Sequence, residues 1–141
     1  MNSQLIMKRI LTLLVMVFGV AFASSAWILE GYLYDFVGKV DNKYNITVYL
    51  VCKEGKLQGK CFYHSTIARQ GVKPCSYLYL NGTYDERDDS VNITVTDCKG
   101  KYIEKWIGEM SSGNRAADID CIIITESGKK MTLDAVDGFG W

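Results

Sequence analysis

The residues of this chain that could do chemistry are one histidine, five cysteines and a pool of acidic side chains. His64 would need a nucleophile beside it, and the nearest thiol in the sequence is that of Cys61. The two are three residues apart, so on a β-strand their side chains point to opposite faces. No nucleophile-elbow or cysteine-protease pattern surrounds His64. We therefore expect His64 at the surface or at the end of a strand, outside any catalytic site.

Two carboxylates are enough for glycoside hydrolysis. Asp118 and Asp120 would lie on one face of a strand, about 7 Å apart, and Glu104 and Glu109 belong to the same pool of 16 acidic residues. In a β-protein with this many acids such pairs arise by chance, and we expect them on solvated strand faces. An enzyme that uses these acids is therefore the function class that we rank last.

The densest charge cluster is Asp-Glu-Arg-Asp-Asp at residues 85–89. It lacks the regular alternate spacing and the glycine of an EF-type calcium loop. We expect a water-exposed connection between two strands, and a site for calcium or for a cationic partner is the alternative. The sequence predicts neither a metal nor a cofactor.

The cysteines number five, which leaves at least one of them without a partner inside the chain. No C-x-x-C pair or tetrahedral zinc pattern is present, so metal ligation is a weak hypothesis. Cys61 and Cys75 bracket a segment that has no strand pattern, and we predict that they form a disulfide. The remaining pairings stay open; the other three are Cys52, Cys98 and Cys121.

Residues 65–74 form the longest stretch without a strand pattern. Long connections in small β-domains are often functional, and this one offers Arg69, Gln70 and Lys73 as candidate contacts to a partner. A loop fixed at its base by a disulfide would lose little entropy on binding. A plain connector is the equal alternative. A second, shorter candidate is residues 110–116, which contribute Arg115.

Period-two alternation of apolar residues dominates the chain after residue 30 and indicates β-strands. Val91, Ile93 and Val95, for example, alternate with polar neighbours. Turns with a central glycine recur at residues 54–56, 99–101 and 127–129, where glycine can adopt the positive φ of a tight hairpin. We predict an all-β fold, an antiparallel sandwich or a small closed barrel of about eight strands. The expected strands are residues 32–36, 44–50, 57–64, 75–80, 90–97, 102–109, 117–125 and 130–136.

The first residues have the order of an export signal. Lys8 and Arg9 precede an apolar run over residues 10–22, and small residues follow it. We predict cleavage after Ala23 or Ala26, which divides the chain into a signal peptide at residues 1–26 and a single β-domain at residues 27–141. An uncleaved membrane anchor is the alternative. The predicted location of the mature protein is the periplasm or the outside of the cell.

The charge of the chain argues against polyanionic partners. The full sequence has 16 basic and 16 acidic residues, and loss of Lys8 and Arg9 leaves 14 basic against 16 acidic, a net charge of −2. Such a balance provides no electrostatic attraction to a phosphate backbone or to an anionic membrane surface. We expect no nucleic-acid binding and no stable membrane insertion.

Three segments carry a resemblance: Gly-Lys-Leu-Gln-Gly-Lys-Cys-Phe-Tyr at 55–63, Tyr-Leu-Tyr-Leu-Asn-Gly at 77–82 and Asp-Cys-Lys-Gly-Lys at 97–101. Together they make residues 44–110 resemble small periplasmic β-proteins of Gram-negative bacteria, of the kind that includes lysozyme inhibitors and immunity proteins against cell-wall-degrading effectors. The serine-glycine-arginine-tyrosine inhibitory loop of one such family does not occur here, so the resemblance assigns no inhibitory residue.

The resemblance implies a binding protein that inhibits or neutralises another protein, with a cell-wall hydrolase as the expected partner. One alternative is a small outer-membrane β-barrel, because the chain ends in Phe-Gly-Trp at 139–141, but Lys105 interrupts an apolar outward face. Another is an adhesive or ligand-binding module that displays Tyr77, Tyr79 and Trp106.

Overall fold

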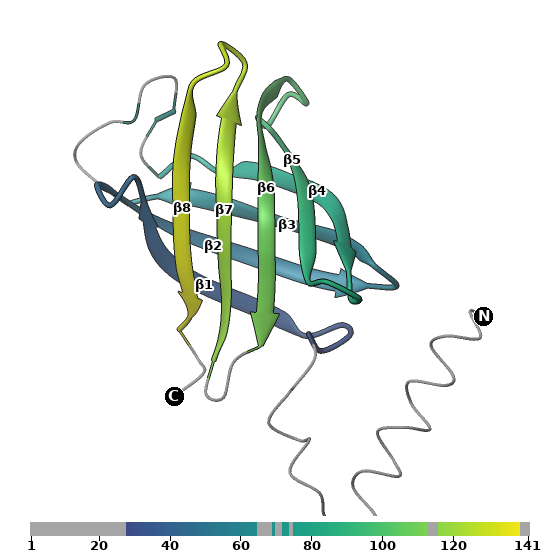
Figure 1. The fold of residues 1–141 in the computed structure, drawn as a ribbon. Helices are drawn as coiled ribbons and strands as arrows, with labels where there is room; N and C mark the ends of the chain where they lie inside the picture. The colour runs from purple at the N-terminus through teal and green to yellow at the C-terminus, as the bar shows by residue number, and fades with distance from the viewer. Residues whose placement is uncertain (1–27, 65–68, 70–71, 74, 113–115, 139–141) are drawn as a thin grey trace, which may run out of the picture.

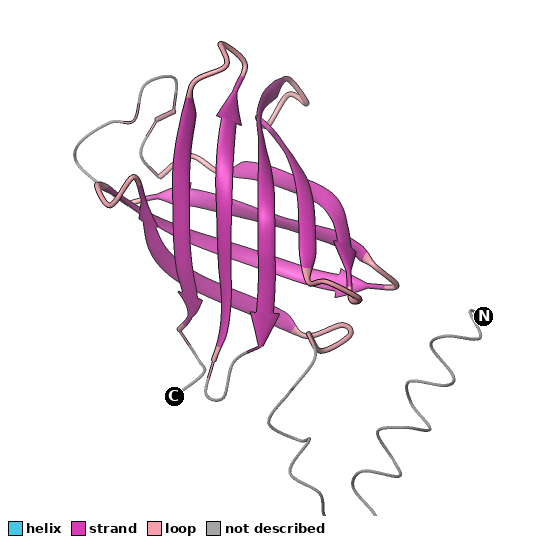
Figure 2. Ribbon diagram, viewed as in Figure 1, coloured by secondary structure: helices cyan, strands magenta, loops and turns pink. Residues whose placement is uncertain are grey.

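The eight strands of the chain close into an antiparallel barrel in the computed structural model (Figure 1). The structure describes residues 28–64, 69, 72–73, 75–112 and 116–138. These residues form strands and their connections without a helix (Figure 2), and hence contain no helix that could cross a membrane. The predicted all-β fold is confirmed, and of the two architectures the closed barrel is the one observed. The predicted signal peptide lies outside the described residues.

Each strand pairs with the next one in the sequence, and β1 pairs with β8 to close the barrel. Figure 1 shows β6, β7 and β8 crossing in front of β1, β2 and β3 at a steep angle, as the strand tilt of a small barrel requires. The strands are β1 (Leu33–Val40), β2 (Tyr44–Lys53), β3 (Lys56–Tyr63), β4 (Leu78–Asp85), β5 (Ser90–Thr96), β6 (Tyr102–Ser112), β7 (Ala117–Thr125) and β8 (Lys130–Asp137).

The interior is filled by side chains at alternate positions of every strand. In β5, for example, Val91, Ile93 and Val95 are buried. An eight-stranded barrel is just wide enough for its inward side chains to fill it, and burial of this apolar surface is the main stabilising contribution. The largest fully buried side chains are Trp106, Phe36, Ile46, Leu50, Leu57, Ile93, Met110, Ile119, Ile123, Leu133, Glu104 and Val40.

The three predicted hairpin glycines lie in the turns. Gly55, Gly100 and Gly128 have φ values of 76°, 80° and 88°, which a residue with a Cβ adopts only at a cost. They connect β2 to β3, β5 to β6 and β7 to β8. The turn chemistry deduced from the sequence is therefore confirmed at all three hairpins.

The fourth strand was misplaced by the sequence pattern. We predicted residues 75–80, whereas β4 runs from Leu78 to Asp85 and contains Gly82. A Cβ at Gly82 would lie 2.2 Å from the carbonyl oxygen of Asn92 on β5. Gly82 therefore does not end the strand, but allows it to come close to its neighbour, a second role of glycine in sheets.

The two ends of the barrel carry opposite charge. The lysine-rich end contains the connections β1–β2, β3–β4, β5–β6 and β7–β8, and the acidic end contains the turns β2–β3 and β4–β5 together with residues 28–32. The lysine-rich end has Lys43, Lys73, Lys99, Lys101, Lys129 and Lys130 against Asp41, Asp97 and Glu126. The acidic end has Glu30, Glu54, Asp85, Glu86, Asp88 and Asp89 against Lys53, Lys56 and Arg87.

Candidate functional site

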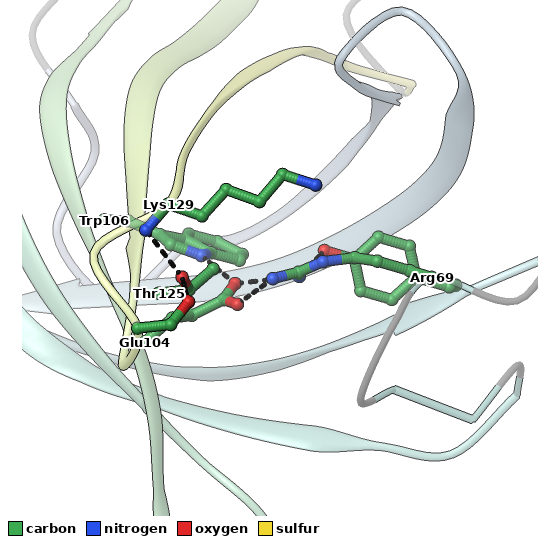
Figure 3. A network of polar contacts seen from close by, with 7 residues as sticks. Arg69, Glu104, Trp106, Thr125 and Lys129 are labelled. Carbon is green, nitrogen blue, oxygen red and sulfur yellow. Dashed lines mark hydrogen bonds and ion pairs between the residues drawn. The ribbon is translucent and has the colours of Figure 1, made fainter.

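A buried ion pair lies beneath the lysine-rich end. Arg69, from the connection between β3 and β4, meets Glu104 of β6, and their side chains are 4% and 0% exposed. Figure 3 shows the guanidinium facing the carboxylate with both nitrogen–oxygen contacts drawn. One of them, Nη1 to Oε2, measures 3.0 Å, and Nη2 donates to Oε1. The pair has the two-pronged geometry that arginine forms with carboxylates.

Two aromatic side chains complete this network. The indole Nε1 of Trp106 donates to Glu104 Oε2 at 2.7 Å, and Arg69 Nη1 donates to the hydroxyl of Tyr63 at 2.5 Å. The Arg69 guanidinium carbon also lies 5.3 Å from the centre of the Tyr63 ring. Both charges are thus removed from water but neutralised and hydrogen-bonded, which is the condition for a stable buried charge.

The pKa values in this region reflect the burial. Desolvation alone would lower the pKa of Arg69, but the hydrogen bonds and charge of Glu104 and Tyr63 outweigh it and leave that pKa raised. Burial, together with the charge of Glu104, raises the pKa of the Cys61 thiol. Burial also raises the pKa of the Tyr63 hydroxyl. Cys61 and Tyr63 therefore stay neutral at physiological pH and neither is a ready nucleophile.

Arg69 does not occupy the exposed position that the sequence suggested for it. It points into the barrel, and Val72 of the same connection is 7% exposed. The backbone nitrogen of Val72 donates to the carbonyl of Arg69 at 3.0 Å. Lys73 is exposed, as expected for a partner contact. Gln70 and Arg115 lie outside the described residues.

The predicted disulfide between Cys61 and Cys75 is not present, and all five cysteines are free. Cys61 faces the barrel interior and is 0% exposed, whereas Cys75 is exposed in the turn before β4. One sulfur is thus in the core and the other in solvent, while a disulfide needs two Cβ atoms about 4 Å apart and facing each other. Within this connection, Arg69 is held by its ion pair with Glu104.

The outer surface at β2, β3 and the start of β4 carries a group of aromatic rings, of which Phe62 contacts both Tyr49 and Tyr77. We call Tyr49, Phe62, Tyr77 and Tyr79 the aromatic face. The ring centres of Tyr49 and Phe62 are 6.2 Å apart, and those of Phe62 and Tyr77 are 5.2 Å apart. Tyr77 and Tyr79 remain 45% and 47% exposed. Aromatic rings grouped on one side of a rigid sheet are a common feature of binding surfaces.

His64 borders the aromatic face. Its side chain is exposed, its ring centre lies 4.4 Å from that of Phe62, and its Nε2 is 2.5 Å from Thr47 Oγ1. Cys61 is buried on the other side of the same strand. Lys60 adds a cation, with Nζ 4.5 Å from the centre of the Tyr77 ring. The position of His64 at the end of β3 agrees with the expectation of a surface histidine.

A cavity of about 560 Å³ opens at the lysine-rich end above the ion pair. Arg69 and Glu104 are part of its lining. A larger cavity of about 970 Å³ opens at the acidic end, where Cys52, Tyr84 and several carboxylates line it. Three of those carboxylates already have partners: Asp85 with Arg87 at 2.7 Å, Glu30 with the backbone nitrogen of Glu54, and Glu86.

Of the carboxylates singled out in the sequence, Glu109, Asp118 and Asp120 lie on the outside of β6 and β7 as expected, whereas Glu104 is buried in the barrel and the expectation of a solvated position was wrong for it. Asp120 is paired across the sheet with Asp134 on one side and Glu109 on the other, and Asp118 is next on its own strand. Burial, a hydrogen bond that protonated Asp120 donates to Asp134, and the neighbouring negative charges raise the pKa of Asp120 to about 6. Among the described residues no group of three or more histidines, cysteines or acids could hold a metal ion.

The raised pKa of Asp120 predicts that Asp120→Asn stabilises the protein at neutral pH. A carboxyl with a folded pKa near 6 and an ordinary value of 3.8 favours folding in its neutral form, and this contribution disappears as the pH rises through that interval. Because Asp120 is exposed to solvent, we expect a gain of only about 0.5–1 kcal/mol at pH 7. Thermal melts should show the gain at pH 7 and almost none at pH 4. A gain of equal size at both pH values, or the same gain in the distant Glu126→Gln control, would contradict this origin.

We predicted Glu104 only as one acid among many and did not pair it with Arg69. The signal was nevertheless present. Glu104 shares the inward face of β6 with Trp106 and Met110, and a carboxylate among core residues usually has a cationic partner. Arg69 gives no such signal, because the pattern of its own segment does not indicate that it turns inward.

The chain was compared with protein-family models, with curated proteins and with solved structures, and it matches none of them.

Proposed function

We propose that this protein is an exported binding protein that inhibits or neutralises another protein, and that the aromatic face is its contact surface. The observation that carries the proposal is the exposure of Tyr77 and Tyr79, 45% and 47%, where Tyr79 is held by strand pairing and Tyr77 packs against Phe62. Tyrosine is among the residues that contribute most to binding energy at protein interfaces. Export is supported by the leader sequence.

The surface is ordered before a partner arrives. Tyr49, Phe62 and Tyr79 belong to strands of a closed sheet, and Tyr77 contacts both Phe62 and Lys60. Arg69, from the connection between β3 and β4, is held by its buried pair with Glu104. Groups that are already in place lose little conformational entropy on binding, so this part of the barrel can provide affinity with few contacts.

The chemistry of the surface fits the cleft of a cell-wall hydrolase. Enzymes that cleave glycosidic bonds hold a pair of carboxylates around the scissile bond. Lys60, whose Nζ lies over the Tyr77 ring, and the exposed Lys73 provide the opposite charge. Complementary charge speeds the encounter and selects among partners. We therefore propose a peptidoglycan-degrading enzyme as the target.

The outer-membrane alternative is less well supported by the side-chain pattern. A transmembrane barrel has apolar residues outside and a polar interior. Here the fully buried side chains are apolar apart from Glu104, while Asp118, Asp120 and Asp134 lie on the outer face. For the adhesive alternative, Tyr77 and Tyr79 are exposed and could contact a ligand, whereas Trp106 is 0% exposed and could not.

The test uses the mature chain, residues 27–141, against a panel of lysozymes and other peptidoglycan hydrolases. We expect one or more of these enzymes to be inhibited and to bind in a calorimetric titration. Tyr77→Ala combined with Tyr79→Ala should weaken that complex by about 2 kcal/mol, or about thirtyfold. Because both side chains are exposed, the double variant should fold as the wild type does.

The matched control is Ile107→Ala combined with Ile122→Ala. These two residues are neighbours on β6 and β7 and are 44% and 49% exposed, but lie away from the aromatic face. The control should bind as the wild type does. Equal loss in both double variants would show that the aromatic face is not the contact surface, and absence of binding across the panel would remove the hydrolase as target.

A further inference from the structure

We infer that the cavity at the lysine-rich end is a binding site for a small organic anion with an apolar body. This goes beyond the proposed function, because the site differs from the aromatic face and its occupant is a small molecule. The inference rests on the shape of the cavity, on one buried donor without a partner and on the charge around the opening.

The cavity has the size and lining of a small-molecule site. Its volume of about 560 Å³ falls within the range of such pockets, which combine apolar walls with a few polar groups. The apolar part of the lining is Val72, Ile103 and Met131, with the rings of Tyr44 and Tyr102. Val72 and Met131 are packed in the core, at 7% and 5% exposure, while Tyr102 is 40% exposed and offers ring surface to an apolar ligand body.

The buried donor is the Nε atom of Arg69. Both Nη atoms of this residue are hydrogen-bonded to Glu104 or Tyr63, but Nε is buried and has no hydrogen-bond partner. Arg69 is also part of the cavity lining. A buried N–H without an acceptor is unfavourable and rare in folded proteins. An oxygen atom of a ligand in the cavity would satisfy it.

The charge around the opening selects an anion. Lys101 and Lys129 line the cavity, and Glu126 is the acidic residue beside them. The charges of Arg69 and Glu104 cancel each other, so the lysines leave a positive surplus. Figure 3 shows the Lys129 side chain extending on the same side of the network as Arg69. Carboxylate and phosphate share the required chemistry, an anionic group with several acceptor oxygens.

The larger cavity at the acidic end does not support the same inference. Asp85 there is paired with Arg87, and Tyr84, which is also in its lining, donates to Asp89 Oδ1 at 2.5 Å. None of the described residues that line it has a buried side-chain polar atom without a partner. Its polar groups are therefore engaged within the turns to which they belong.

The test titrates the mature chain with four probes that share a decyl chain: decanoate, decyl phosphate, decanol and decyltrimethylammonium. We expect decanoate or decyl phosphate to bind at least about tenfold more tightly than the neutral and cationic probes. The tighter of the two anions identifies the preferred head group. Equal affinity for the cationic probe, or no binding of either anion, would overturn the inference.

Site-specific evidence comes from the arginine side chains. In a nitrogen-detected NMR titration the Nε–H signal of Arg69, assigned through Arg69→Lys, should shift as the anion binds. The signal of Arg87, which is paired with Asp85 at the other end, should not shift and serves as the internal control. Binding without a shift of the Arg69 signal would place the ligand elsewhere and refute the inference.

Two exposed lysines provide a variant that should fold normally. Lys101→Gln combined with Lys129→Gln should weaken anion binding about fivefold to tenfold. Lys99→Gln is the matched control, because Lys99 is an exposed residue of the same end that does not line the cavity. The control should bind like the wild type. Equal affinities of the double variant and the wild type would contradict the role of the two lysines.

Discussion

Replacing Glu104 with glutamine should lower the free energy of unfolding by about 3–5 kcal/mol, because it leaves the charge of Arg69 buried without its partner. Glu104 is 0% exposed and contacts both Arg69 and the indole of Trp106. Glutamine keeps the size of the side chain and an acceptor for the indole, so the lost interaction is the charge itself. Urea unfolding followed by tryptophan fluorescence measures the loss.

The matched control is Glu109→Gln on the same strand. Glu109 is exposed, and a substitution there should change stability by no more than about 0.5 kcal/mol. If Glu104→Gln and Glu109→Gln had the same small effect, Glu104 would not be the buried partner of Arg69 in solution.

A double variant separates the unpaired charge from the lost packing. Arg69→Met together with Glu104→Met removes both charges and fills the space with apolar atoms. It should be more stable than the sum of the two single variants predicts, with a coupling energy of about 1–3 kcal/mol. Full recovery is not expected, because the hydroxyl of Tyr63 and the indole of Trp106 would lose their partners. Strict additivity would contradict a direct pair.

The buried pair positions Arg69 in the barrel more than it raises the net free energy of unfolding. A buried ion pair is often no more stabilising than apolar side chains of similar volume. Arg69 comes from a long connection and Glu104 from β6, so their contact holds Arg69 against the barrel. It also places Arg69 in the lining of the cavity at the lysine-rich end.

The fold could be predicted because its determinants are local. Apolar alternation in a segment such as Val91–Ile93–Val95 depends only on neighbouring residues. The glycines Gly55, Gly100 and Gly128 mark the positions of three hairpin turns, where they adopt positive φ. The choice between a sandwich and a barrel was left open by the sequence, because it depends on the pairing of β1 with β8, about 95 residues apart.

The site could not be predicted, because it depends on contacts between distant parts of the chain. Arg69 and Glu104 are 35 residues apart. Nothing in the sequence of residues 65–74 indicates that the Arg69 side chain points into the barrel. The same segment suggested the Cys61–Cys75 disulfide, because spacing does not reveal that Cys61 faces the core. Strand alternation predicts which face a residue occupies only within a strand, and a loop has no such rule.

Replacing Gly59 with alanine should be the second severe substitution. Gly59 lies between the buried Leu57 and Cys61 on the inward face of β3, and a Cβ there would lie 1.8 Å from the carbonyl oxygen of Tyr49. The close contact is with backbone, so β2 and β3 must separate at a point where they are paired. Overpacking of this kind costs about 3 kcal/mol. Similar close approaches occur at Gly38, Gly82 and Gly108.

Gly100→Ala is the control that separates space from backbone conformation. Gly100 has a φ of 80° and nothing lies within 4 Å of a Cβ built on it, so alanine there meets only the left-handed backbone penalty of about 1–2 kcal/mol. Urea unfolding of both variants should therefore rank Gly59→Ala as clearly less stable than Gly100→Ala. The opposite order would mean that β2 and β3 have room for a Cβ at Gly59. The close approach of the two strands would then not depend on the missing side chain of this glycine.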